Sequence, residues 1–333
     1  MDTEQTIQAF RDTYAALRAE IAKVVVGQET VVEGTLIALF AGGHVLLEGV
    51  PGLGKTLLVR TLSEVLNLSF NRIQFTPDLM PADILGTNIV MENAAGRREF
   101  EFQRGPIFAH LVLADEINRA TPKTQSALLE AMQEHQVTAG GQLRKLDEPF
   151  FVMATQNPID QEGTYPLPEA QLDRFFFKIL VGYPTAADLA AVLDRTTRSG
   201  RTTVDKILER DALWDLMQVV REVPVASHVK DYAVRLMLAT HPKTATAAPI
   251  ANQYLRFGSS PRGGQTMILA GKVRALIQGR FNVSFDDLEA VAPLALRHRL
   301  ILNFEAEAEG ITTDQVIAQV LRDVPRDADA VSV

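Results

Sequence analysis

One short string limits the fold of this chain more than any other: Gly49-Val50-Pro51-Gly52-Leu53-Gly54-Lys55-Thr56. It matches the pattern G-x-x-x-x-G-K-[ST], and it lies between an apolar segment and a helical pattern. Glycines allow the backbone N–H groups of such a loop to turn toward a bound anion, and a helix N-terminus adds partial positive charge. The string therefore predicts a strand, a phosphate-binding loop and a helix in direct succession.

The residues of this loop have separate expected roles. Lys55 can reach the β- and γ-phosphates of a nucleotide, and the Thr56 hydroxyl can bind Mg²⁺. The residues expected to contact the nucleotide here are Gly49, Pro51, Gly52, Leu53, Gly54, Lys55, Thr56 and Leu57. A dinucleotide-binding fold is disfavoured, because Leu57 stands where G-x-G-x-x-G needs its third glycine. No Asn-Lys-x-Asp string is present, so a guanine-specific switch protein has no support.

The chain up to Tyr183 alternates strand-like apolar segments with helical ones. Strands are predicted at 44–48, 72–75, 111–114, 150–154 and 175–180. Helices are predicted at 1–23, 29–41 and 56–66, with another that begins after Thr121. This alternation predicts an α/β fold with a parallel sheet covered by helices on both faces. Two segments, 87–102 and 136–146, are predicted to be inserted β-hairpins, with plain surface loops as the alternative.

The pattern changes after Tyr183. Residues 1–183 carry the whole net charge of −8, and the apolar spacing beyond Pro184 is helical. We predict an α/β domain over 1–183, an all-helical domain over 184–322 and a short, polar, frayed tail over 323–333.

Two adjacent carboxylates, Asp115 and Glu116, follow the predicted strand at 111–114. Together with a phosphate loop they form a Walker B pattern, in which Asp115 would hold Mg²⁺ and Glu116 would polarise the attacking water. The presence of both acids favours a hydrolase over a scaffold that only binds nucleotide.

Two more polar residues lie next to later strands. Asn157 would orient the lytic water or contact the γ-phosphate, or it is a turn residue before Pro158. Arg174 either pairs with Asp173 or a helix end, or reaches the phosphate of a neighbouring subunit as an arginine finger. The local sequence leaves both choices open.

The order of these features along the chain resembles that of an AAA+ ATPase: a phosphate loop, two carboxylates, Asn157, Arg174 and then a helical domain. Several longer strings of the sequence resemble the MoxR family in particular. Most of the similar strings lie within 24–183. They are Val26-Gly27-Gln28-Glu29, Phe75-Thr76-Pro77-Asp78-Leu79-Met80-Pro81-Ala82-Asp83-Ile84, Ala114-Asp115-Glu116-Ile117-Asn118-Arg119-Ala120, Ala154-Thr155-Gln156-Asn157-Pro158 and Glu162-Gly163-Thr164-Tyr165-Pro166-Leu167-Pro168-Glu169-Ala170-Gln171-Leu172-Asp173-Arg174-Phe175. The resemblance extends into the helical domain through Gly258-Ser259-Ser260-Pro261-Arg262-Gly263.

The resemblance implies a P-loop NTPase core of AAA+ type, with β-hairpin insertions, followed by an all-α lid domain. It implies that Asn157 is the sensor 1 residue, Arg174 the arginine finger and Arg262 the sensor 2 residue near the γ-phosphate. Arg119 would contact the next subunit or form a local ion pair. The residues that would enclose the adenine are Val26, Gly27 and Gln28.

The resemblance also implies an activity. The chain would be a Mg²⁺-dependent ATP hydrolase that assembles as a homo-oligomeric ring, a hexamer, and remodels a protein client as a chaperone. Its partner would carry a von Willebrand factor A domain. The alternatives are a magnesium-chelatase-like AAA+ motor subunit, a DNA-dependent ATPase and a nucleotide-gated scaffold without turnover. DNA is disfavoured because neither predicted hairpin is rich in basic residues.

The composition excludes some further classes of function. A net charge of −8 argues against a broad nucleic-acid surface, which needs clustered Lys and Arg. The absence of cysteine excludes disulfides and thiolate chemistry. The acidic N-terminus and the shortness of the apolar runs predict neither an export signal nor membrane insertion, so a cytoplasmic location is expected.

Overall fold

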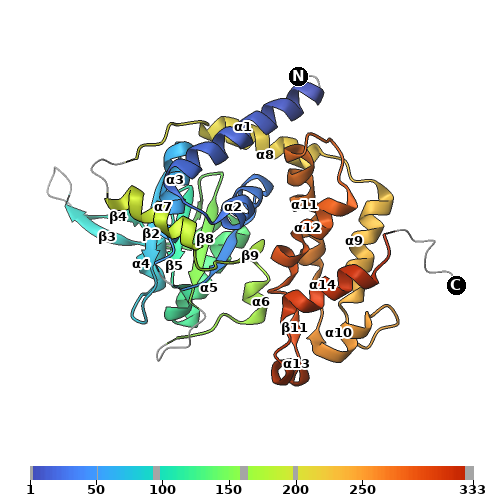
Figure 1. The fold of residues 1–333 in the computed structure, drawn as a ribbon. Coiled ribbons are helices and arrows are strands. Elements are labelled where there is room, and N and C mark those ends of the chain that lie inside the picture. Colours follow the sequence, from blue (N-terminus) through green and yellow to red (C-terminus); the bar gives the residue numbers. More distant parts are fainter. Residues whose placement is uncertain (1–2, 51, 93–97, 158–163, 198–201, 327–333) are drawn as a thin grey trace.

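The structure is a computed structural model that describes residues 3–50, 52–92, 98–157, 164–197 and 202–326. Figure 1 shows an α/β body, in blue to green, beside a helical body, in orange to red. Some predicted features lie outside the described residues, namely Pro51, the turn of the first hairpin, Pro158, Glu162-Gly163 and residues 327–333 of the tail predicted over 323–333. Within the described part, no helix has the length and apolar character needed to cross a membrane.

The α/β body is built on a five-stranded sheet with the order β2-β5-β8-β1-β9. Every neighbouring pair is parallel, as the alternation of strands and helices predicts. The strands are β1 (Val45–Glu48), β2 (Phe70–Gln74), β5 (Leu111–Asp115), β8 (Phe151–Gln156) and β9 (Phe177–Leu180). Their carboxyl ends share one edge, so the phosphate loop after β1 and the carboxylates at the end of β5 lie together.

Successive side chains of the strands enter two different cores. Val45 and Leu47 pack into a hydrophobic cluster with the first three helices, whereas Leu46 packs into a second cluster with α5. The helices of this body are α1 (Thr3–Val24), α2 (Glu29–Ala41), α3 (Lys55–Val65), α4 (Pro81–Leu85), α5 (Pro122–Glu134) and α6 (Glu169–Leu172), with a 3-10 turn at Ile117–Arg119. The sheet is therefore covered on both faces, which accounts for its almost wholly apolar strands.

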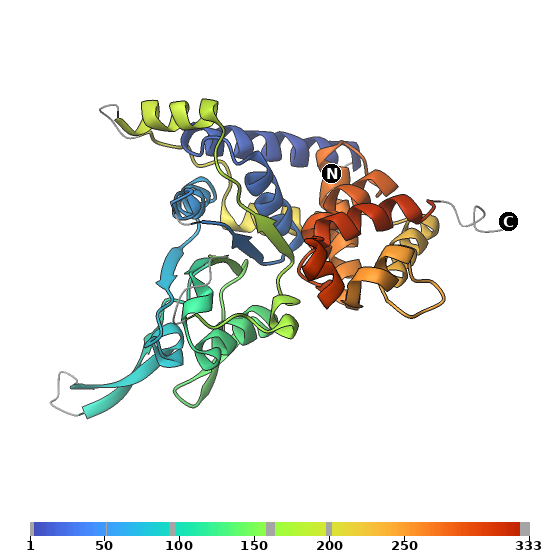
Figure 2. The same cartoon turned by 60° about the horizontal axis from the view of Figure 1, so that its bottom comes forward.

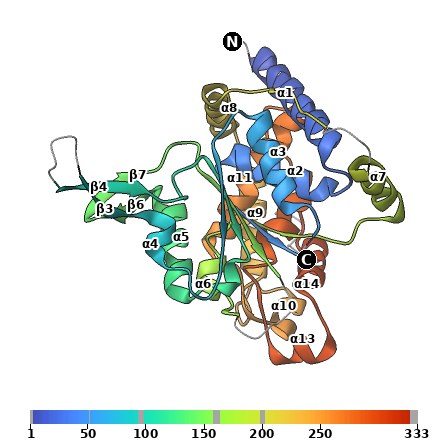
Figure 3. The ribbon, with the colours of Figure 1, turned by 90° about the vertical axis from the view of Figure 1, so that its left-hand side faces the viewer.

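Both predicted hairpins are confirmed. Strand β3 (Gly86–Glu92) pairs with β4 (Arg98–Arg104), and β6 (Gln136–Ala139) pairs with β7 (Gln142–Lys145). The two hairpins lie side by side and project away from the helical body (Figures 2 and 3). The guanidinium carbon of Arg144 lies 3.6 Å from the centroid of the Phe102 ring, which joins one hairpin to the other.

The chain after Tyr183 is helical, as predicted. The helices are α7 (Ala186–Thr197), α8 (Arg210–Glu222), α9 (Ser227–Ala239), α10 (Pro249–Tyr254), α11 (Pro261–Ile277), α12 (Phe285–Leu296), α13 (Phe304–Glu309) and α14 (Thr313–Asp323). The structure adds one detail, a short antiparallel pair of β10 (Leu255–Phe257) with β11 (Ile301–Leu302). Helix α7 lies against α1, because Arg195 donates to the carbonyl of Ala22 at 2.8 Å. The division at residue 183 stays a prediction.

His44 joins α5 to β8 through its buried ring. Its Nε2 lies 3.0 Å from the carbonyl oxygen of Met132, and its Nδ1 accepts the N–H of Val152 at 3.1 Å. The neutral ring satisfies both contacts, whereas a proton on Nδ1 would face a donor. Burial lowers the pKa of His44 from 6.5 to about 4.

We expect the free energy of unfolding to fall as the pH drops from 6.5 toward 4. In that window the unfolded chain binds a proton at His44 that the folded chain does not, which costs up to about 1.4 kcal/mol per pH unit. Urea denaturation at about pH 7.5 and about pH 5.5 measures the effect. The variant His44→Gln should have a smaller pH slope than the wild type, and equal slopes would contradict the assignment.

Candidate functional site

A cavity of about 410 Å³ opens at the carboxyl edge of the sheet, between the phosphate loop and the ends of β2, β5 and β8. It is lined by Gly49, Gly52, Gly54, Lys55, Thr56, Leu57, Arg72, Gln74, Asp115, Glu116, Thr155 and Asn157. The structure thus brings together the predicted phosphate loop, both predicted carboxylates and Asn157. A larger, mostly apolar cleft of about 760 Å³ between α9 and α11 shares none of these residues.

The phosphate loop has the backbone that its glycines allow. Gly52 and Gly54 have φ angles of 87° and 77°, which L-amino acids rarely adopt. A Cβ atom placed on either glycine would have no neighbour within 4 Å, so both glycines border open space. Leu53 packs against the hydrophobic core instead, and Gly54 is the N-cap residue of α3. The N-terminus of α3 therefore faces the cavity.

Lys55 is one of the residues that line the cavity. Its Nζ donates to the carbonyl oxygen of Gly49 at 2.7 Å, so the ammonium group is held above the loop. Burial lowers the pKa of Lys55, while the carboxylates of Asp115, Glu116 and Glu48 act in the opposite direction. A desolvated cation in this position attracts an anionic ligand more strongly than an exposed lysine would.

The carboxylate of Asp115 is fixed from two sides. The hydroxyl of Thr155 donates to Oδ1 at 2.6 Å, and Arg72 donates to Oδ2 from Nη2 at 2.6 Å and from Nε at 3.1 Å. Thr155 is almost completely buried in β8, whereas Arg72 lies on the neighbouring strand β2. Both donors keep the Asp115 carboxylate directed toward the cavity.

Glu116 has a backbone conformation that is unusual for a residue with a side chain. Its φ is 56° and its ψ is 49°, in the left-handed region. Its N–H donates to the Thr155 hydroxyl at 2.8 Å, which holds this conformation in place. Its Oε2 accepts from Arg119 Nη1 at 2.9 Å and from Gln74 Nε2 at 3.2 Å. Within one chain, Arg119 thus forms the local ion pair that was one of its two predicted roles.

Two of the three predicted adenine contacts, Gly27 and Gln28, pack against the chain that follows β9. Gln28 donates from Nε2 to the carbonyl oxygen of Gly182 at 3.1 Å. A Cβ atom on Gly27, whose φ is 64°, would lie 2.7 Å from the carboxyl carbon of Asp188. Gln28 thus binds the connection between β9 and α7, and Gly27 lies against α7 itself. The same connection begins at Val181, which packs against Gly49 at the start of the phosphate loop. Val26, Gly27 and Gln28 are not among the described residues that line the 410 Å³ cavity.

Arg174 lines another cavity, of about 520 Å³, instead of the phosphate cavity of its own chain. The walls of this second cavity come from α5, the β6–β7 hairpin and α6, and they include the acidic residues Glu130 and Glu134. The sequence allowed Asp173 as a local partner of Arg174. The carboxylate of Asp173 instead binds Ser260, Arg262 and Arg299 of the helical body.

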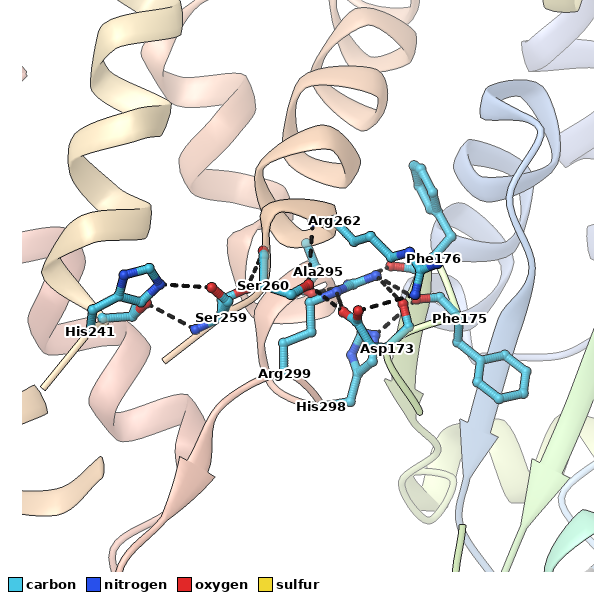
Figure 4. A network of polar contacts seen from close by, with 11 residues as sticks. Asp173, Phe175, Phe176, His241, Ser259, Ser260, Arg262, Ala295, His298 and Arg299 are labelled. Carbon is cyan, nitrogen blue, oxygen red and sulfur yellow. Dashed lines mark hydrogen bonds and ion pairs between the residues drawn. The ribbon is translucent and has the colours of Figure 1, made fainter. Parts of the chain in front are cut away.

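Arg262 is bound to Asp173 (Figure 4). Its Nη1 lies 3.3 Å from Asp173 Oδ2. Ser260 is the N-cap of α11, and its hydroxyl accepts the N–H of Arg262. Arg262 is not among the described residues that line the phosphate cavity, so the two are separate in this conformation.

Comparisons with known proteins agree with this arrangement. The model of the ATPase family associated with various cellular activities (AAA) matches residues 44–177, and that of the AAA lid domain matches residues 247–320. Chaperone MoxR1 of Mycobacterium tuberculosis is 45% identical over 307 residues, covering 92% of this chain and 80% of the relative. The chain belongs to the MoxR family of AAA+ ATPases.

Two further similarities extend over almost the whole of this MoxR-family ATPase. Protein MoxR of Methylorubrum extorquens is 30% identical and covers 95% of this chain and 96% of its own length. A crystal structure of a protein from Cytophaga hutchinsonii superposes with a TM-score of 0.90 at 42% identity, covering 97% of each chain. The predicted fold, an α/β AAA+ core with an all-helical lid, is confirmed.

The structure places three residues in the cavity of this MoxR-family ATPase that the motifs did not single out: Arg72, Gln74 and Thr155. Arg72 and Gln74 come from β2, whose pairing with β5 places Gln74 opposite Asp115. Only the register of the sheet shows this. Thr155 had a weak signal in the sequence, since it is a polar residue near the end of an apolar strand.

We expect Thr155→Val to impair the site at nearly constant volume. The change removes the hydrogen bond to Asp115 and leaves the N–H of Glu116 without its acceptor. Turnover should fall by about tenfold to a hundredfold, as for other residues that orient ligands, and the unfolding free energy should fall by about 1–3 kcal/mol. Phosphate release and thermal denaturation measure both effects. Thr155→Ser keeps the hydroxyl and should behave as wild type, and a valine variant with full turnover would contradict this role.

Proposed function

We propose that this MoxR-family protein is a Mg²⁺-dependent ATP hydrolase that forms a ring and remodels client proteins. The observation that carries the proposal is the convergence of Lys55, Thr56, Asp115, Glu116 and Asn157 on one cavity at the carboxyl edge of the sheet. These are the groups that phosphoryl transfer to water needs: a cation for the phosphates, hard oxygen ligands for a metal and a carboxylate for the nucleophile.

The residues present fit a nucleotide with Mg²⁺. Gly52 and Gly54 leave open the space that side chains would fill, so backbone N–H groups can approach phosphate oxygens. The Thr56 hydroxyl and the Asp115 carboxylate are oxygen donors, which Mg²⁺ prefers, and Mg²⁺ is commonly held by one or two protein ligands together with phosphates. Bound there, Mg²⁺ would neutralise charge on the β- and γ-phosphates.

The side chains of the cavity would have separate roles in binding the phosphates and activating the water. Lys55 would bind the phosphates, and Glu116 would hold and polarise the attacking water. Asn157 would orient that water from the end of β8, as the sensor 1 role implies. Thr155 fixes the backbone of Glu116 and the carboxylate of Asp115, so the two acids would keep their geometry while substrate enters.

The position of Arg174 supports assembly. Arg174 lines a cavity different from the phosphate cavity of its own chain, which fits a finger that completes the site of a neighbour. We propose a homo-oligomeric ring, a hexamer, with ATP between subunits. Arg262 would leave Asp173 and act as the sensor 2 residue near the γ-phosphate, coupling hydrolysis to rotation of the helical domain.

The proposed biological role is maturation or remodelling of partner proteins in the cytoplasm. The Mycobacterium tuberculosis relative is named a chaperone, which supports a protein client. A partner with a von Willebrand factor A domain is proposed because membership of the MoxR family implies one.

Phosphate release by the purified protein tests this function. We expect ATP turnover with Mg²⁺ and a loss of about two orders of magnitude or more when EDTA removes the metal. Equal turnover with and without Mg²⁺, or no turnover at any protein concentration, would contradict the proposal. A turnover per subunit that rises with protein concentration is expected if the site is completed between subunits.

A further inference from the structure

The segment that carries Arg174 is held by a buried arginine from the helical body (Figure 4). Arg299, which follows α12, donates from Nη2 to the carbonyl oxygens of Asp173 at 3.1 Å and Phe175 at 2.7 Å. Its Nη1 donates to the carbonyl oxygen of Phe176 at 3.3 Å. The guanidinium group therefore binds the main chain on both sides of Arg174.

The side chain of Asp173 strengthens this attachment. Its Oδ1 accepts from Arg299 Nε at 2.9 Å and from the Ser260 hydroxyl at 2.6 Å, and its Oδ2 accepts from Arg262 Nη1 at 3.3 Å. All these donors belong to the helical body, whereas Asp173 belongs to the α/β body. The carboxylate of Asp173, the residue before Arg174, thus binds both the start of α11 and the segment that follows α12.

A neighbouring histidine holds the same segment. His298 is buried, and its Nε2 lies 3.0 Å from the carbonyl oxygen of Phe175. Burial keeps the pKa of His298 well below its ordinary value, so the ring is neutral and Nε2 donates its proton to the carbonyl. The bonds from His298 and Arg299 occupy the Phe175 carbonyl, and β9 begins only at Phe177.

An arginine suits this position better than any other cation. The side chain of Arg299 is 2% exposed, and burial lowers its pKa to about 10, so it stays charged near neutral pH. Its planar group offers several N–H donors in fixed directions, which serve a carboxylate and several carbonyls at once, whereas an ammonium group is a compact point donor. Burying such a charge is costly unless it is fully hydrogen-bonded, and these contacts satisfy it.

We propose that Arg299 is a positioning residue for the arginine finger, fixing the direction in which Arg174 leaves the α/β body. The proposal rests on the proposed function, in which Arg174 completes the site of a neighbouring subunit. Because Arg299 is part of the helical body, a rotation of that body would move the Arg174 segment with it. Arg262 binds the same carboxylate, so its departure from Asp173 would alter the hold on that segment.

The test measures ATP turnover of Arg299→Gln in the full-length protein, alone and in mixed rings. Alone, this variant should bind a fluorescent ATP analogue with wild-type affinity and lose about tenfold to a thousandfold in turnover. Mixed in equal amounts with Glu116→Gln, which has an intact finger but no functional water-activating carboxylate, it should recover to roughly a quarter of the wild-type rate per subunit. A defect in the donated finger is repaired by a neighbour, whereas a defect in the subunit's own site is not.

Three further variants complete the design. Arg297→Gln is the matched control, because Arg297 is also a lid arginine that bonds to the α/β body, at the Lys178 carbonyl, and to Asp314, without touching the Arg174 segment. It should keep turnover within about twofold. Arg299→Lys keeps the charge and should have a smaller defect than Arg299→Gln, and it replaces Arg299→Gln if that variant does not fold. Arg174→Ala is the reference for a finger defect.

The outcomes separate this inference from the proposed function. Mixing with Glu116→Gln can restore ATP turnover for Arg174→Ala but not for the Arg299 variant. In that case the positioning role of Arg299 is wrong, and the finger role of Arg174 is still supported. Wild-type turnover in the Arg299 variant alone also overturns the positioning role. If Arg174→Ala itself does not recover, the finger mechanism fails and the positioning role fails with it. Recovery of both variants, with an active Arg297→Gln, supports the inference.

Discussion

Glu116→Gln is expected to bind ATP with Mg²⁺ and to hydrolyse it at least about a hundredfold more slowly than the wild type. The amide keeps the size of the side chain and can accept from Arg119 and Gln74, as Glu116 does, but it cannot polarise water as a carboxylate does. Binding of a fluorescent ATP analogue and steady-state phosphate release measure the two effects separately.

The matched control for that variant is Glu64→Gln, on the exposed surface of α3, where Glu64 accepts from Arg60 at 3.2 Å. A surface pair of this kind contributes little, so this variant should turn over as wild type. A Glu116→Gln protein with undiminished turnover would show that the second carboxylate does not act on the water.

Arg174→Ala is the second change with a large expected effect. An arginine finger supplied by a neighbour commonly contributes about a thousandfold or more to turnover. We expect a loss of this order, with nucleotide affinity nearly unchanged, because Arg174 lines a cavity separate from the phosphate loop of its own chain. Steady-state turnover at saturating ATP measures the loss.

The control for the finger is Arg60→Ala, which removes an exposed arginine from α3. It should retain turnover within about twofold. If Arg174→Ala lost nucleotide affinity instead of turnover, the residue would act in binding within its own chain.

The fold could largely be predicted from the sequence because local signals and the global arrangement agree. Strand-like runs separated by helical patterns predicted the parallel sheet, and the pattern over 136–146 predicted the second hairpin. Leu46 and its neighbours alternate between two cores, but both cores are apolar, so the sequence shows a continuous apolar run instead of an alternating one. The order of the strands required the structure.

The sequence predicted those parts of the candidate site that belong to a motif directly after a strand. The loop and Asp115-Glu116 both follow strands, so a parallel sheet brings their side chains to the same edge. Arg72 could not be found in this way, because its contact with Asp115 depends on the pairing of β2 with β5.

Arg299 was equally hidden in the sequence. It is one of two arginines near the end of α12. Only the fold shows that Arg299, and not Arg297, reaches the carbonyls around Arg174. The place of Arg262 on Asp173 depends likewise on how the helical body lies against the α/β body. Such long-range contacts have no local pattern from which they could be read.

The central claim is that ATP is hydrolysed at sites shared between subunits, and a mixing experiment tests it most directly. Glu116→Gln and Arg174→Ala should each be nearly inactive alone. Combined in equal amounts, they should turn over ATP at roughly a quarter of the wild-type rate per subunit, because about that fraction of interfaces pairs an intact Glu116 with a neighbour's intact Arg174. A mixture as inactive as its two components would contradict the account.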